Sequence, residues 1–211
     1  MGVPAEEMVT FITGLFAIVN PIGVIPIYAS YAMGLPEKLK TVLARRTVLV
    51  ATGILIVFAL FGYYIFTMFG ITYASFRIAG GLLLFKIGFD KLHGRLPRTK
   101  YTEEEARELL EKEDVAITPL ATPLVAGPGA ITTVVIGFYS QDSFYWRGWI
   151  LLSIVIVMSI TYFTLLYSEK LLERLGRTGV LAIHRVMGLL ITAISVEMIL
   201  RGIEMWLQIV G

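Results

Sequence analysis

Two short segments combine residues that interrupt a helix with residues that let a ligand approach the backbone. The first is Asn20-Pro21-Ile22-Gly23, and the second is Gly127-Pro128-Gly129-Ala130. Proline removes a backbone N–H and clashes with the preceding turn, and glycine permits conformations that a side chain forbids. A helix broken in this way has free N–H groups of partial positive charge at one new end and free carbonyls of opposite sign at the other. Such ends can bind an anionic and a cationic group.

Two breaks that meet would therefore suit a small zwitterion. The residues expected to bind it are Asn20, Pro21, Ile22, Gly23, Gly127, Pro128, Gly129, Ala130 and Thr133. Free amides would bind the anionic group, and the Asn20 amide and Thr133 hydroxyl would add side-chain hydrogen bonds. The alternative is that both segments are proline kinks that only shape helix packing.

The rest of the chain places these segments in a membrane. Of its 211 residues 56% are hydrophobic and 16% charged, and the mean hydropathy is +0.77, which is typical of an integral membrane protein. One crossing needs about 20 apolar residues. The expected crossings lie at about 6–33, 43–69, 74–94, 118–140, 146–169 and 180–209. The first is too long for the core of a signal peptide, so we expect it to stay in the mature protein.

Basic residues gather in three of the expected loops. They are Lys38, Lys40, Arg45 and Arg46 after the first crossing, Lys91, Arg95, Arg98 and Lys100 after the third, and Lys170, Arg174 and Arg177 after the fifth. These three loops face one side of a six-crossing chain. By the positive-inside rule they are cytoplasmic, which predicts a multi-pass protein of the cell membrane with both termini extracytoplasmic.

The long polar stretch at 94–115 divides the chain into two similar halves. We expect a three-helix repeat over 1–94, a cytoplasmic linker with a short surface helix over 95–117, and a second repeat over 118–211. Arg77-x-x-Gly80 matches Arg185-x-x-Gly188, at nearly the separation of the two proline segments. Three crossings end on the far side, so the second repeat is inverted. The predicted fold is an all-α membrane protein of six transmembrane helices in two inverted repeats, with helices 1 and 4 discontinuous. This arrangement is typical of secondary transporters.

The residues from Asn20 to Pro26 and from Pro119 to Thr133 resemble the two signature segments of the MarC family of membrane proteins, and the resemblance covers essentially the whole chain. Within that family the sequence is most similar to the SnatA group, which transports small neutral amino acids such as glycine and alanine. The resemblance implies a secondary transporter in which the two broken helices form the substrate site.

Charged residues inside the crossings are further candidates for function. Glu197, one turn before Arg201, is the acid best placed to bind a coupled proton, although the two can also neutralise each other as an ion pair. His93 and His184 are expected at helix ends, without the partners that a metal site or proton relay needs. We expect no metal and no cofactor. The expected partners are a small neutral amino acid and the lipid bilayer. We expect no nucleic acid, and a homo-oligomer is a further possible assembly.

Other classes of function remain to be weighed against transport. The sequence has neither a G-x-S-x-G nor an H-E-x-x-H motif, so we do not expect an enzyme. A small-solute channel is the nearer alternative, because paired half-helices also build pores, and export of a different small molecule is another. A purely structural membrane protein would leave the paired breaks unexplained.

Overall fold

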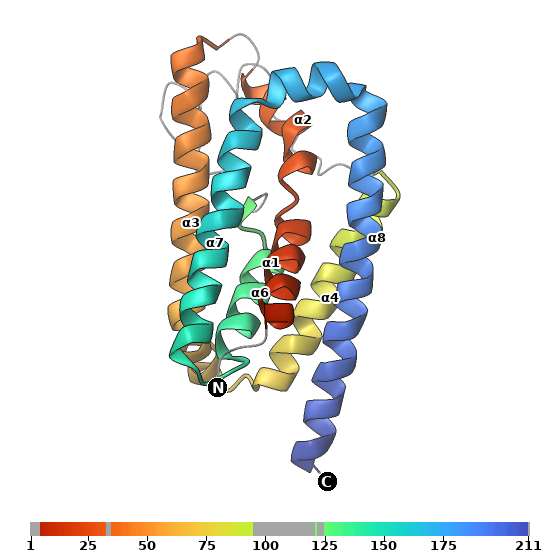
Figure 1. Ribbon diagram of the computed structural model, residues 1–211. Helices are drawn as coiled ribbons and strands as arrows, with labels where there is room; N and C mark the ends of the chain where they lie inside the picture. Colours follow the sequence, from red (N-terminus) through yellow and green to blue (C-terminus); the bar gives the residue numbers. More distant parts are fainter. Residues whose placement is uncertain (1–4, 33–34, 95–120, 122–124, 211) are drawn as a thin grey trace.

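The computed structural model describes residues 5–32, 35–94, 121 and 125–210. All the elements in these ranges are helices (Figure 1). The predicted linker at 95–117 lies outside the described residues, and so does most of the part of the fourth crossing that precedes Val125.

The first crossing is broken at Asn20, as the sequence predicts. Helix α1 (Ala5–Val19) ends there and α2 (Pro21–Ala32) begins at the next residue. Pro21 has no N–H to donate to the carbonyl of Ala17, and Asn20 takes a left-handed conformation with φ 51°, which asparagine tolerates better than most residues. At 1.5 Å per residue, about 22 Å of helix precede the break and about 18 Å follow it, so Asn20 lies near mid-depth.

Helix α6 (Pro128–Tyr139) is the innermost helix of the bundle, and eight of its residues are buried. Small residues let its neighbours approach closely: Val135 packs on Gly62, Thr132 packs on Gly80, and Phe11 packs on Gly137. Side chains of neighbouring helices also donate to backbone carbonyls of α6. Trp146 Nε1 donates to Gly137 O at 2.7 Å, and Tyr73 Oη donates to Ile136 O at 2.7 Å. The residues that make these contacts with α6 lie on α1 and on three helices described in the next two paragraphs.

Two long helices run the height of the bundle beside this centre, α3 (Glu37–Met68) and α7 (Phe144–Leu166) (Figure 1). The Ser143 side chain accepts from the N–H of Trp146 and so caps the start of α7.

The other side of the bundle is an antiparallel pair of helices, α4 (Tyr73–Leu92) and α8 (Ser168–Val210). Small residues recur every seventh position on both: Ala74, Gly81 and Gly88 on α4 face Gly202, Ser195 and Gly188 on α8. A Cβ built at Gly188 would lie 2.5 Å from Leu92 N and 2.8 Å from Gly88 O, so the backbones are in direct contact. At Gly176 (φ 63°) α8 turns, and residues 168–175 run across the end of the bundle (Figure 1).

The helices are long and apolar enough for a multi-pass membrane protein. Within the described ranges four segments meet that description, Ala5–Ala29, Glu37–Met68, Phe144–Leu166 and Thr178–Gln208, and α6 is a shorter apolar helix. The 20-residue α4 is not among the four segments, and it carries several charged residues. The count of six crossings therefore stays a prediction. The start of α1 and the end of α8 lie at the same end of the molecule (Figure 1).

Candidate functional site

The break between α1 and α2 is built around the side chain of Asn20, the chain's only asparagine. Asn20 is the N-cap of α2: its Oδ1 accepts from the N–H of Gly23 at 3.2 Å, and Pro21 fills the first helical position, where an N–H is not needed. The residue is only 2% exposed. The cap therefore stabilises a helix start deep inside the protein, where water cannot satisfy the free amides.

The same amide also contacts a histidine from the far end of the chain. Asn20 Nδ2 lies 3.3 Å from Nδ1 of His184, which is on α8 and 3% exposed. The prediction that His184 lies at a helix end is wrong: it lies inside α8 and against the break. No local pattern signals this, because the two residues are 164 positions apart and meet only when α2 packs on α8.

The second break leaves the start of α6 without a side-chain cap. Gly127 is the N-cap residue of α6 and has an extended conformation. A proline, Pro128, follows it, as Pro21 follows Asn20 at the first break. Among the described residues, the N–H groups of Gly129 and Ala130 have no hydrogen-bond acceptor. Both residues are buried. An uncapped, buried helix start is an anion-binding environment, because N–H groups and the helix dipole both favour negative charge.

The hydroxyl groups of Thr132 and Thr133 already donate hydrogen bonds within α6. Thr133 Oγ1 donates to Gly129 O at 2.9 Å, and Thr132 Oγ1 donates to Pro128 O at 2.8 Å. The Thr133 oxygen keeps its lone pairs, so in this conformation the side chain can act toward a ligand only as an acceptor.

The structure brings the two breaks together. The Cβ position of Gly129 is 3.4 Å from Cγ2 of Ile18, so the carbonyl end of α1 adjoins the amide end of α6. Leu84 of α4 closes the same place, packed directly against Gly129. The C-terminal end of α1 and the N-terminal end of α6, which carry opposite partial charges, therefore lie next to each other.

Glu197 lies apart from this cluster. Its side chain is 57% exposed, and its Oε1 accepts from Arg201 Nε at 2.6 Å. Among the described residues there is no group of three or more His, Asp or Glu side chains that could hold a metal ion.

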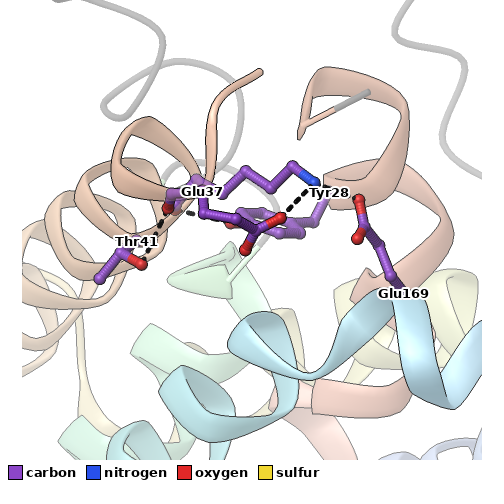
Figure 2. A network of polar contacts seen from close by, with 5 residues as sticks. Tyr28, Glu37, Thr41 and Glu169 are labelled. Carbon is purple, nitrogen blue, oxygen red and sulfur yellow. Dashed lines mark hydrogen bonds and ion pairs between the residues drawn. The ribbon is translucent and has the colours of Figure 1, made fainter. Parts of the chain in front are cut away.

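A second polar cluster ties three helices together at the end of the bundle where α3 begins (Figure 2). Lys40 Nζ contacts Glu37 at 2.9 Å and Glu169, at the start of α8, at 2.6 Å. Tyr28 of α2 donates its hydroxyl to the Lys40 carbonyl at 2.8 Å. We call these four residues the Lys40 network. It links the far end of the broken helix to α3 and α8.

Known proteins are similar to this chain over nearly all of its length. The family described as MarC family integral membrane protein matches residues 5–207. UPF0056 membrane protein PH0760 of Pyrococcus horikoshii is 41% identical over 202 residues, which cover 94% of this chain and 96% of that protein. UPF0056 membrane protein MJ1677 of Methanocaldococcus jannaschii is 39% identical over 192 residues (91% and 93%).

Bacterial relatives are similar over the same extent. UPF0056 membrane protein YhcE of Escherichia coli is 34% identical over 199 residues, which cover 92% of this chain and 90% of that protein. No solved structure matches the chain. The family match runs from the start of α1 nearly to the end of α8, so the chain belongs to the MarC family of integral membrane proteins.

Proposed function

We propose that this protein is a secondary transporter of small neutral amino acids such as glycine and alanine, which bind as zwitterions between the breaks at Asn20 and Gly127. The observation that carries the proposal is the meeting of the two breaks. The uncapped amides of Gly129 and Ala130 offer a site for the carboxylate, and the carbonyl end of α1 beside Ile18 offers a site for the ammonium group.

The packing of α4 on α8 supports the inverted repeat that such a transporter needs. One separation of 107 residues relates Asn20-Pro21 to Gly127-Pro128, Gly81 to Gly188, and Gly88 to Ser195. Gly81 faces Ser195 while Gly88 faces Gly188, so exchanging the halves maps one contact onto the other. A two-fold axis between the helices has this property. In this register Arg77 corresponds to His184, one residue away from the match of Arg77 with Arg185.

The close packing beside the breaks supports a small substrate. Gly23 is hemmed in by Asn20 and by His184, whose Nδ1 would lie 2.6 Å from an added Cβ, and Gly129 is closed by Leu84. Where the backbone itself is so crowded, a ligand with a large side chain would displace packed residues.

Transport by purified protein in liposomes tests the proposal. Liposomes preloaded with unlabelled glycine should accumulate labelled glycine faster than empty ones, because a carrier that exchanges substrate is stimulated from the opposite side. Flux should saturate, and alanine should compete while leucine should not. Flux without exchange stimulation would identify a channel, and no glycine flux at all would overturn the proposed substrate.

A further inference from the structure

The hydrogen bonds at the first break determine the tautomer of His184. An asparagine amide has one oxygen that accepts and one nitrogen that only donates. Because the Gly23 N–H needs an acceptor, Oδ1 of Asn20 faces Gly23, and Nδ2 must face His184. Nδ1 of His184 must then accept, so the neutral ring carries its hydrogen on Nε2. That nitrogen is buried and has no hydrogen-bond partner among the described residues.

We infer that His184 binds the proton that is transported together with the substrate, and that rotation of the Asn20 amide couples the two. This inference rests on the proposed transport function. A proton added to Nδ1 would face the N–H groups of Asn20, donor against donor. The amide must rotate so that Oδ1 accepts from His184, and Gly23 then loses its acceptor. The N–H of Gly23, released at the start of α2, can then donate to one oxygen of the substrate carboxylate, whose other oxygen accepts from the amides of Gly129 and Ala130.

Each binding event is unfavourable without the other. A protonated His184 leaves the buried Gly23 N–H unpaired unless an anion accepts from it. A carboxylate finds that N–H already occupied unless the amide has rotated. Binding of the proton and of the carboxylate are therefore linked, and by linkage each strengthens the other by the same factor.

The charges around His184 favour the same coupling. Lys91 on α4 is the charged group whose field reaches the ring, and the described residues of α1, α2 and α7 add none. Arg185 is next along α8, and its guanidinium lies 3.5 Å from the Cβ position of Gly94, at the end of α4. A carboxylate bound beside the ring supplies the opposite charge that stabilises an imidazolium.

Calorimetric titration of the purified protein with glycine, in buffers of different ionisation enthalpy, measures the protons taken up on binding. We expect the parent to take up close to one proton per glycine, with affinity rising up to about tenfold for each unit that the pH falls while His184 titrates. His184→Gln should bind glycine without this uptake. His93→Gln is the matched control, because His93 is exposed at the end of α4, where its Nδ1 hydrogen-bonds the Phe89 carbonyl at 2.9 Å and does not contact the break.

Nitrogen NMR of the unmutated side chain keeps the inference testable if His184→Gln does not fold. The chain has two histidines, so ¹⁵N-histidine labelling in the His93→Gln background isolates His184. We expect the neutral Nε2–H tautomer without glycine and a doubly protonated ring with saturating glycine. A ring that stays neutral with glycine bound would overturn the inference, as would proton uptake that persists in His184→Gln but is lost in Glu197→Gln. If the parent binds no glycine, the transport proposal itself fails.

Discussion

At the scale of single residues, Asn20 shapes the first break with both its backbone and its side chain. Its backbone takes the left-handed conformation that ends α1, while its side chain caps α2 and contacts His184. The backbone and side-chain contributions can be separated by substitution, because glycine adopts positive φ without strain and alanine does not.

Replacing Asn20 should therefore affect binding and stability differently. Asn20→Gly and Asn20→Ala should both weaken glycine binding by about 1–3 kcal/mol, because both leave the protonated His184 without the amide oxygen that accepts from it. Asn20→Ala should also be less stable than Asn20→Gly by about 1–2 kcal/mol, the cost of positive φ. Calorimetry and thermal unfolding in detergent measure the two effects. Gln141→Ala removes an amide near the chain's Glu7 instead and should change neither.

Gly129 is a packing residue as well as a candidate ligand residue. From sequence, a bulky residue here would be expected to block the substrate and leave the fold intact, but the structure packs Leu84, which is fully buried, against the Cα. Gly129→Ala should destabilise the protein by about 1–3 kcal/mol through overpacking.

A second substitution tests that cause. Leu84→Val removes the methyl group in the way, so adding it to Gly129→Ala should recover part of the lost stability, as a coupled pair does. Gly14→Ala, where nothing lies within 4 Å of the new Cβ, is the control and should be neutral or slightly stabilising in thermal unfolding. Full additivity of the two changes would contradict the packing explanation.

At the scale of helices, the α4–α8 pair depends on backbone contact rather than on side-chain burial. Lipid is as apolar as leucine, so membrane helices associate through close packing of small residues. Gly188→Ala would place a methyl group 2.5 Å from a backbone nitrogen, which cannot rotate away. Thermal unfolding should show a loss of about 1–3 kcal/mol or more. Gly53→Ala on α3 meets nothing within 4 Å, and an equal loss there would show that any added methyl is harmful.

The ion pairs of the Lys40 network are weak enough to open in the transport cycle proposed above. Ion pairs with exposed partners contribute about 0–1 kcal/mol, and the Glu37 and Glu169 side chains are 84% and 53% exposed. Lys40→Gln should therefore shift thermal stability little but should change the rate of glycine exchange in liposomes, because the start of α3, to which Tyr28 of α2 stays bonded, is released from Glu169 of α8. An unchanged exchange rate would show that this end of the bundle does not separate during the cycle.

At the scale of the whole molecule, the charges on the two ends of the bundle predict its orientation. The starts of α3 and α8, which carry Lys38, Lys40, Lys170 and Arg174, lie at the end opposite the start of α1 (Figure 1). The positive-inside rule predicts that this end is cytoplasmic.

Cysteine labelling tests the orientation cleanly, because the chain has no cysteine of its own. Asp142→Cys and Lys38→Cys are both exposed positions, at opposite ends of the bundle. In intact cells an impermeant maleimide should label the first variant and should label the second only after permeabilisation. The reverse pattern would show the opposite orientation, and labelling of both in intact cells would contradict a membrane-spanning bundle.

The sequence alone determined the membrane class, the all-helical fold, the family and the position of the break at Asn20. These follow from local properties: apolar length sets a crossing, and Asn20-Pro21, unlike Pro26 inside α2, joins a missing N–H to a residue that tolerates positive φ. The uncapped start of α6 after Gly127 is local in the same sense, since no polar side chain stands at the cap position.

Tertiary structure decided which residues share the site. The contact of Asn20 with His184, the closing of Gly129 by Leu84, and the register of Gly88 on Gly188 each depend on how one helix is rotated against another. Exposure of Glu197 depends on the same rotation. In a membrane, the pattern of apolar residues is a weak guide to the rotation of a helix, because lipid and protein interior both accept apolar side chains. The rotation is set instead by close packing between helices far apart in the sequence.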